Sequence, residues 1–481
     1  MVIEDLFRRP YHEHLNDIIK NMVDGVISEN EVLVQEIKDW LASDVRKSML
    51  VGEAYYLNKT DIHEKKKRDA EWKSNVKLEH GFAKKLVDQK IGYLLTKEPT
   101  IGTENKQYGK LLGELVFNRK FLKKLKNTGK ESINKGIAYL YVYFDEEGQL
   151  SFKKFPSEQI LPFWKDNEHT ELSSFIRVYK ETIYMNGKKE FQTKVEYHHP
   201  NGINYFVLEG GKLIQDVPAG IESTYHFTIN DKPFLWTRMP LIPFKYNEEE
   251  QPLIDTIKSL IDNYNTQAST NADLLADIPQ FIYKLVNYGG ADLKEFIDDL
   301  NRFKAVKLDE QGDVDKLQAT PETDATEKEL DRDRKSIYEF GRGVDTTNEN
   351  LGNASGVALR FRYGDLDMDC NTLESEFQAS LEHLMWFVNE YFLITGQGDF
   401  TKEKVNIIFN RDIIINESEV ITDCSNSVGI LDDKTIRENH PWYNEDVEKR
   451  LEDQKAAEKK EQEEYLDTFQ KQQKTVPMGD E

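Results

Sequence analysis

The residues best suited to chemistry are four of the carboxylates between positions 365 and 376. Asp365, Asp367 and Asp369 alternate, and Glu376 stands twelfth counting from Asp365, which is the ligand spacing of an EF-hand calcium loop. Cys370, however, occupies the position where such a loop needs glycine for its turn. A helix explains the same residues, because Asp365 and Asp369 then share one face at i, i+4. We therefore expect a helix here and no metal ion.

Two glycine-containing motifs lack a part that their chemistry requires. Gly211-Lys212 is followed by Leu213, so the phosphate-binding loop pattern fails. The stretch GNASG at 352–356 has the wrong spacing for a nucleophilic serine, and it precedes a helix without following a strand. Neither motif predicts catalysis.

Two further motifs are better explained as turns. The pair His198-His199 precedes Pro200 at the end of a strand, so we favour a turn over a metal site. Gly289-Gly290 lies before a helix, but Asp292 near the helix N-terminus would repel a phosphate. We predict no enzyme, no catalytic residue and no cofactor.

Charge limits the partners that the chain can bind tightly. Its 87 acidic residues outnumber 64 lysines and arginines, giving a net charge of −23. Such a chain is a poor general nucleic-acid binder, because phosphate affinity comes mainly from lysine and arginine. It could still handle DNA that passes without being gripped. Two basic clusters, at 65–68 and 119–130, could meet phosphates or an acidic partner, or simply be solvated helix faces.

Length and apolar content indicate a soluble protein of several domains. The 481 residues contain no apolar run long enough to span a membrane, and the N-terminus lacks the apolar core of a signal peptide. Cys370 and Cys424 are too few for a disulfide framework or a zinc cluster. We expect Cys370 to be a reduced, buried thiol.

Periodicity predicts an α+β fold. Apolar residues at helical spacing run through 15–48, with a break near Gly25 that suggests two helices, and again through 82–95. From 134 to 250 the period changes to two, with turn residues between the runs, which predicts antiparallel hairpins.

The following segments predict a long helix, an insert and a second helix. Residues 252–277 keep a 3–4 spacing without a break, 278–321 read as a compact α/β insert, and 322–342 read as a heavily charged helix. The next fourteen residues, GVDTTNENLGNASG, form a long polar loop. Loops of this length inside a domain are uncommon and usually functional. Another long helix begins near 355, with a kink or break expected at Gly364.

This order of elements resembles the portal proteins of tailed bacteriophages, in particular the family of long-tailed phages of Gram-positive hosts. Stretches similar to that family's recurring segments cover most of the chain in the correct order: 54–67, 77–101, 252–278, 352–367 and 427–453.

The resemblance implies a virion protein that assembles with itself into a ring, a homo-dodecamer or a 13-mer, at one capsid vertex. The ring would be a head-tail connector and a channel for double-stranded DNA during packaging and ejection, and it would form in the host cytoplasm. It would contact the terminase large subunit, the head-completion adaptor, and the major capsid and scaffolding proteins, but no membrane.

The resemblance also implies a domain assignment. Its parts are the N-terminal helical part of the wing at 1–133, the antiparallel β-rich wing at 134–251, a stem helix at 252–277, an α/β clip at 278–321, a stem helix at 322–342, the tunnel loop at 343–354, a long kinked helix returning to the wing at 355–426, and a helical crown with a disordered tail at 427–481.

The tunnel loop is then expected to surround moving DNA. Small polar residues give backbone freedom and weak, exchangeable hydrogen bonds, whereas a ring of lysines would hold the phosphates. The expected loop residues are Thr346, Thr347, Asn348, Glu349, Asn350 and Asn353, and the expected channel-wall residues of the stem are Lys328, Arg332, Lys335 and Arg342.

Two alternative functions remain open at this point. One is a metal-dependent DNA-processing enzyme that uses Asp365 and Asp369, which would cleave DNA with magnesium. The other is a non-viral scaffold or adaptor that uses the basic helix at 111–130, which would be a stable monomer with a helical partner.

Overall fold

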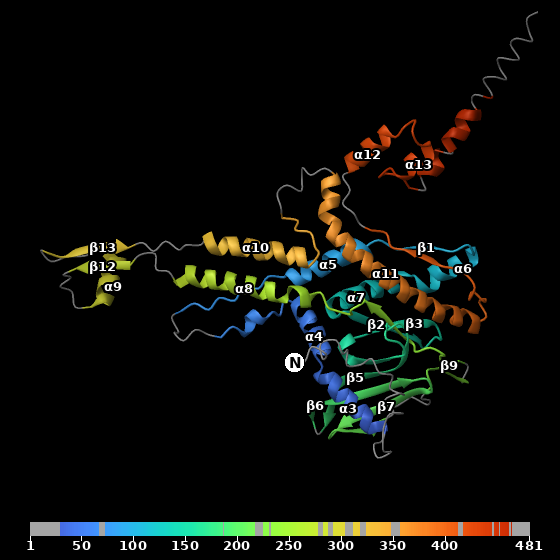
Figure 1. Cartoon of the computed structure of the whole chain (residues 1–481), viewed down its shortest axis with the longest axis horizontal. Helices are drawn as coiled ribbons and strands as arrows, with labels where there is room; N and C mark the ends of the chain where they lie inside the picture. Colours follow the sequence, from blue (N-terminus) through green and yellow to red (C-terminus); the bar gives the residue numbers. More distant parts are fainter. Residues whose placement is uncertain are drawn as a thin grey trace, which may run out of the picture. The chain divides into compact units, whose positions relative to one another are not determined.

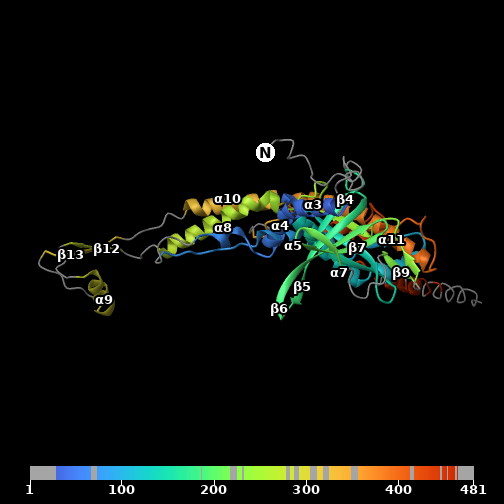
Figure 2. The ribbon, with the colours of Figure 1, turned by 90° about the horizontal axis from the view of Figure 1, so that it is seen from below.

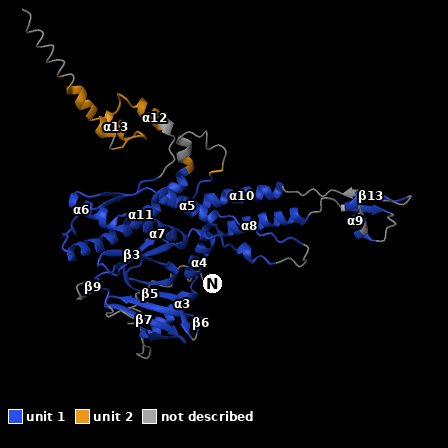
Figure 3. Ribbon diagram, turned by 180° about the vertical axis from the view of Figure 1, so that it is seen from behind, with its two compact units in different colours: residues 1–345, 363–412 blue, residues 346–362, 413–481 orange. Residues whose placement is uncertain are grey.

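The structure is a computed structural model in which contacts divide the chain into two units (Figures 1 and 3). Unit 1 comprises residues 1–345 and 363–412, and unit 2 comprises 346–362 and 413–481. Each is described by itself. The structure describes residues 29–66, 73–185, 187–216, 225–229, 232–277, 282–286, 292–303, 311–317, 324–347, 356–411, 417–444, 447–451, 453–460 and 463.

Unit 1 begins with helices that confirm the predicted periodicity and correct one boundary. They are α3 (Glu29–Ala42), α4 (Asp44–Tyr56), a 3₁₀ turn (Asp61–Glu64) and α5 (Phe82–Leu95). The predicted helical run to residue 48 is interrupted at Ser43, and α4 begins there. The Ser43 hydroxyl accepts a hydrogen bond from Arg46 N and so caps α4. Residues 15–28, including the break expected near Gly25, lie outside the described residues.

A second group of helices packs between α5 and the β-strands. It comprises α6 (Lys106–Leu111), a π-helical turn (Leu112–Val116) and α7 (Arg119–Lys135). Gly129 on α7 faces Ile91 and Leu95 of α5 so closely that an added Cβ would lie under 3.0 Å from both side chains. This close approach brings the two helices together.

The β region is antiparallel, as predicted. One sheet has the order β11-β2-β3, and a larger sheet has the order β4-β5-β6-β7-β8. Their strands are β2 (Ile137–Phe144), β3 (Leu150–Phe155), β4 (Ile160–Trp164), β5 (Leu172–Met185), β6 (Lys188–His199), β7 (Gly202–Glu209), β8 (Lys212–Gln215) and β11 (Leu241–Lys245). Shorter pairs are formed by β1 (Thr100–Gly102) with β14 (Asn406–Ile408) and by β9 (Phe227–Ile229) with β10 (Lys232–Phe234).

Strand β2 separates two hydrophobic cores. Ala138, Leu140 and Val142 join the core that also contains α5, α7 and the later long helix. Ile137 and Tyr139, which point to the opposite face, join the core beneath α3 and the larger sheet. Alternation along one strand therefore supplies both cores.

Strands β5 and β6 extend beyond their neighbours as a two-stranded ribbon (Figure 2). Pairing with β7 ends at Lys194, whereas β5 and β6 pair onward from Lys180↔Thr193 to Met185↔Lys188. Tyr184 and Phe191 on this ribbon are exposed.

The segment after the sheets follows the predicted order. It comprises α8 (Ile254–Asp277), β12 (Ile282–Val286), α9 (Leu293–Phe303), β13 (Asp313–Leu317) and α10 (Asp324–Phe340). In the insert, β12 pairs with β13, and Tyr283 packs against the buried Phe296 of α9. Residues 304–310 of the predicted insert and the predicted Gly289-Gly290 turn lie outside the described residues.

A 39-residue helix, α11 (Gly356–Ile394), follows. The helix continues through Gly364, so the expected break there is wrong. The alternative expectation, a kink at Gly364, stays a prediction. Its middle confirms the helix predicted for Asp365 to Glu376. Unit 2 adds α12 (Glu417–Asn426) and α13 (Asp433–Glu438). Among the described residues, no helix is long and apolar enough to cross a membrane.

Gly136, which ends α7, gives a test of this packing. Its φ is +82°, and an added Cβ would lie 1.9 Å from the carbonyl oxygen of Glu250. We expect Gly136→Ala to lower the free energy of unfolding by more than about 3 kcal/mol, since backbone must move. Gly148→Ala, at φ +73° with nothing within 4 Å, should cost only about 1 kcal/mol. Equal losses in urea titrations would contradict the steric argument.

Candidate functional site

The two helices predicted to wall a channel lie side by side as α8 and α10 (Figures 1 and 2). Ile337 and Tyr338 of α10 are buried, and between the helices Asn263 Nδ2 donates to Asp333 Oδ2 over 2.7 Å. Asp333 is itself buried, and this burial raises the pKa of its carboxyl above the ordinary value despite the hydrogen bond. The buried face of α10 therefore includes a carboxylate.

Sequence reasoning missed a row of buried polar residues on α8. Asn265, Ser269 and Asp273 are fully buried and accept hydrogen bonds from backbone N–H groups of the extended segment 76–80. The Asp273 carboxylate also pairs with Lys65 Nζ at 2.8 Å. The available signal was the spacing i, i+4, i+8 of three short polar residues, which places them on one helix face.

The cations predicted for the channel wall on α10 lie on its exposed face. Lys335 pairs with Asp331 at 2.5 Å, and Arg332 pairs with Glu329, in both cases within the helix. Lys328 is exposed beside them. Pairs of this kind contribute little to stability, so these residues are available for a role at the surface.

The end of α10 is tightly defined. Gly343 N donates to Tyr338 O over 2.9 Å and Arg342 N donates to Glu339 O over 3.1 Å, the two bonds of a Schellman cap. Arg342 therefore adopts φ +47°, a conformation usually left to glycine. At Gly343, a Cβ would lie 2.2 Å from the side chain of Leu86 on α5. No other residue fits this approach without movement.

The first residues after α10 are held in place. Val344 is buried, and Gln89 of α5 binds its N–H at 2.9 Å and its carbonyl at 3.1 Å. Arg334 makes a two-pronged pair with Asp345 at 2.8 and 2.9 Å. This geometry is stronger than a single contact between the same charges, so the predicted tunnel loop starts from a fixed point.

Four residues, named here the Asp369 cluster, lie beside this start: Lys90, Tyr246, Arg342 and Asp369. Asp369 Oδ2 accepts from Tyr246 at 2.8 Å and pairs with Lys90 at 2.7 Å, while Oδ1 faces Arg342 at 3.5 Å. Burial, followed by the nearby Asp369 charge, raises the pKa of Tyr246 well above its ordinary value. The hydroxyl thus stays a donor to Asp369.

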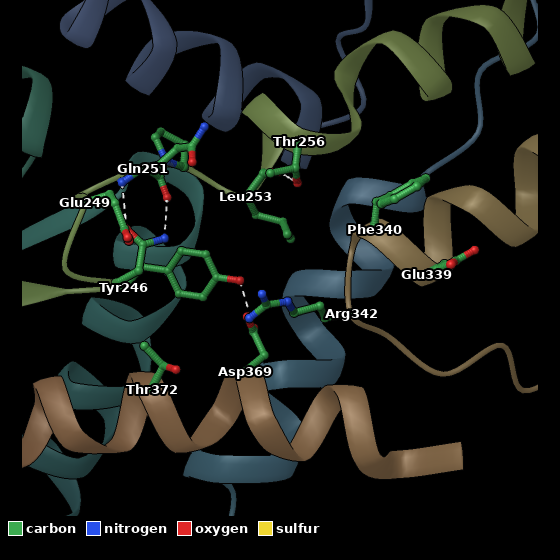
Figure 4. A pocket seen from close by; sticks show the side chains of 12 residues that line it. Tyr246, Glu249, Gln251, Leu253, Thr256, Glu339, Phe340, Arg342, Asp369 and Thr372 are labelled. Atoms are coloured by element: carbon green, nitrogen blue, oxygen red, sulfur yellow. Dashed lines mark hydrogen bonds and ion pairs between the residues drawn. The ribbon is translucent and has the colours of Figure 1, made fainter. Parts of the chain in front are cut away.

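A cavity of about 610 Å³ opens next to the Asp369 cluster (Figure 4). Its lining includes Tyr246, Asp369 and the side chain of Arg342, with Glu249 and Glu339 from neighbouring segments. The structure thus directs Arg342, predicted as a channel-wall residue, toward Asp369, although its side chain remains 57% exposed.

The tunnel-loop residues are only partly described. Thr346 and Thr347 are exposed. Asn348, Glu349, Asn350 and Asn353, together with the GNASG motif up to Ser355, lie outside the described residues.

Two of the carboxylates that mimic a calcium loop have other partners. Asp367 pairs with Arg411 and accepts from Tyr93, while Asp369 pairs with Lys90. Cys370 is fully buried, as predicted, and burial raises the pKa of its thiol to about 12. Within the described parts of the chain, no group of three or more His, Cys, Asp or Glu residues could hold a metal ion.

The remaining motifs are structural. His198 is buried and stacks on Phe175 with ring centroids 4.2 Å apart, and the predicted turn follows β6.

The two basic clusters are only partly exposed. Lys65 binds Asp273 and Lys130 binds Asp88 at 3.0 Å, whereas Lys120 and Lys123 are exposed. The basic stretch therefore splits between internal pairs and a solvated face.

The buried Asp333 predicts a pH effect. Because its folded pKa lies above its unfolded pKa, ionisation costs stability as pH rises, and protonation removes that cost. We expect Asp333→Asn to raise the melting temperature relative to wild type near pH 7 and to lose that advantage progressively as pH falls to about 3, where the aspartate is mostly protonated in both states. Asp331→Asn, on the exposed face, is the control. An advantage independent of pH would contradict the assignment.

Comparison with known proteins identifies the family of the chain. Residues 44–464 match the family described as phage portal protein, SPP1 Gp6-like. The portal protein of Bacillus phage SPP1 is 31% identical over 457 residues, covering 92% of this chain and 89% of the relative. The portal protein of Clostridium phage phiCD119 is 31% identical over 439 residues, covering 86% of this chain and 94% of the relative.

Solved structures give a more distant likeness. The neck of a native GTA particle, computed with C12 symmetry, matches with 13% identity and a TM-score of 0.39, covering 75% of this chain and 89% of the other. The neck of an empty GTA particle matches with 11% identity and a TM-score of 0.42, covering 74% and 89%.

The sequence match spans both units and nearly the full length of the two phage relatives. The chain belongs to the SPP1 Gp6-like family of phage portal proteins, the ring-forming structural proteins that provide the DNA channel at the portal vertex of the virion.

Proposed function

We propose that the chain forms a ring of about twelve or thirteen copies in which α8 and α10 of each copy wall the channel. The observation that carries this proposal is the pairing of these two helices across Asn263 and Asp333, immediately before the polar loop. In this arrangement the exposed face of α10, with Lys328, Arg332 and Lys335, faces the channel or a neighbouring subunit.

The insert at 278–321 serves as the clip. Its first described strand pairs with its last, from Ile282↔Leu317 to Val286↔Asp313, so the chain leaves α8 and returns to α10 through one closed module. Phe296 is buried within it. A module of this kind suits docking of the terminase large subunit during packaging and of the head-completion adaptor afterwards.

The polar segment at 343–354 serves as the tunnel loop. Thr346 and Thr347 are exposed directly after the anchored Val344. Hydroxyl and amide groups exchange hydrogen bonds with phosphates easily, whereas lysine or arginine would release counterions and bind strongly. The chain has neither residue type between 343 and 354, which suits DNA that slides.

The acidic balance of the chain agrees with the same role. Helix α10 carries six acidic and four basic residues, and the exposed cations Arg332 and Lys335 have carboxylate partners one turn away. A wall of this composition offers DNA little net attraction. This composition therefore suits DNA that passes through the channel without binding tightly to its wall.

The other parts take the domain roles expected from the resemblance. Residues 1–133, 134–251 and 355–426 form the wing, and 427–481 form the crown, with capsid and scaffolding proteins as their partners. Portal proteins are structural, so family membership supports the expectation that the chain is not an enzyme, and it supports neither the metal-dependent enzyme nor the non-viral scaffold.

Negative-stain electron microscopy and native mass spectrometry test the ring directly. We expect closed rings with a central hole and a mass of roughly twelve or thirteen chains. A monomer or dimer at all salt and protein concentrations would contradict the proposal.

Adding a cation to the loop tests its contact with DNA. In Thr347→Lys rings we expect double-stranded DNA, driven through a single ring in a solid-state pore, to pass several-fold more slowly at about 0.05 M salt, because each subunit adds a phosphate contact. The slowing should vanish at about 1 M salt, where the Debye length falls to about 3 Å.

The matched control is Ala379→Lys, which adds the same charge at an exposed position of α11. Equal slowing by both variants would show a general charge effect and would contradict the proposal that the loop contacts DNA in the channel.

A further inference from the structure

The tunnel loop has two flanks in unit 1, and both contact the same helix. The entering flank is 341–345 after α10, and the leaving flank is 363–370 on α11. We propose that Lys90 of α5 is a positioning residue that holds both flanks of the loop at one fixed place. The inference rests on the proposed function only in naming the loop as the part that meets DNA.

The entering flank is bound through its backbone. Lys90 Nζ donates to Arg342 O over 3.0 Å, and the adjacent Gln89 binds both backbone groups of Val344. Leu86, one turn earlier on α5, contacts Gly341 and Gly343 so closely that a Cβ on either would collide with it. These contacts depend on backbone position and not on the identity of the loop side chains.

The leaving flank is bound through side chains. The same Lys90 ammonium pairs with Asp369 Oδ2 at 2.7 Å. Tyr93, nearly one turn later on α5, donates to Asp367 Oδ1 over 3.0 Å and stacks on Tyr363 with ring centroids 6.1 Å apart. Consecutive turns of α5 therefore contact the helix that leaves the loop.

Of the four α5 residues named above (Leu86, Gln89, Lys90 and Tyr93), Lys90 is the one that bonds to both flanks. Its side chain is fully buried, so the ammonium has exchanged water for these two oxygens. A buried charge keeps its partners at fixed geometry, because any movement that separates them leaves the charge without compensation. An apolar residue of similar length would fill the same volume but would tolerate sliding of the two flanks past α5.

The consequence for the ring is common placement of the loops. If each subunit fixes both flanks to its own α5, the segments between the flanks start and end at equivalent points in every subunit. Relative movement of α10 and α11 then requires breaking the Lys90 bonds in the subunit concerned.

Spin labelling of assembled rings without DNA tests this role. The label is attached through Thr347→Cys in a Cys424→Ser background, since the buried thiol of Cys370, with its pKa near 12, does not react at neutral pH. The variants are Lys90→Met and the double variant Lys90→Met with Asp369→Asn, which also removes the buried carboxylate charge that loses its lysine partner in the single variant.

We expect loss of the immobilised component of the nitroxide spectrum in both variants. The melting temperature should recover in the double variant, because no buried charge is left without a partner, whereas the label should stay mobile. A purely structural role would make both readouts recover together. The control Lys110→Met removes an exposed lysine of α6 whose partner Glu114 lies one turn away, and it should change neither.

Gln89→Leu keeps the test decisive if the Lys90 variants do not assemble. It removes two hydrogen bonds from the entering flank without leaving a charge, and it should also mobilise the label. A wild-type spectrum in the double variant, or in Gln89→Leu if only that variant assembles, would overturn the proposal. Because DNA is absent, this result is independent of whether the loop lines the channel, which the Thr347→Lys experiment decides.

Discussion

The arrangement around the loop depends on satisfying one buried ammonium group. Helix α5 is buried along nearly its whole length, and Lys90 lies within it with no exposure to solvent. The charge must find oxygen atoms from other segments, and the two that it finds belong to the end of α10 and to α11. These bonds connect the carbonyl of Arg342, directly after α10, and the side chain of Asp369 on α11 to the same residue of α5.

Periodic features of the sequence predicted the elements well. The apolar spacing predicted α5 at 82–95 with both ends correct, and the alternation in 137–144 predicted the strand that serves two cores. The same logic identified the acidic run at 365–376 as helical. These successes share a cause: burial on one face imposes a period that can be read locally.

Features that depend on partners far away in the sequence could not be predicted from the sequence. The polar row of Asn265, Ser269 and Asp273 binds the backbone of residues 76–80, almost two hundred positions earlier in the chain. Lys90 looks like any lysine in an amphipathic helix until Asp369 is brought beside it. Of the predicted site, sequence reasoning placed the α10 cations on an exposed face, but the direction of Arg342 toward Asp369 depends on a cap geometry that composition does not reveal.

Electrostatics in this chain are compensated locally. The net charge of −23 is large, and the exposed stem cations Arg332 and Lys335 each lie one turn from a carboxylate, while the buried Lys90 pairs with a carboxylate of another helix. Such pairs leave the net charge unchanged, so neighbouring copies in the proposed ring repel one another through their acidic excess, and salt screens that repulsion.

The ribbon formed by the ends of β5 and β6 has a consequence for evolutionary change. Among the residues that the structure describes, no third strand pairs with it beyond Lys194, so its length does not affect the register of the sheet. Because side chains alternate between faces, insertions or deletions that change both strands equally preserve the facing of every remaining residue. Lineages can therefore lengthen or shorten this projection freely while the cores on either side of β2 stay as they are.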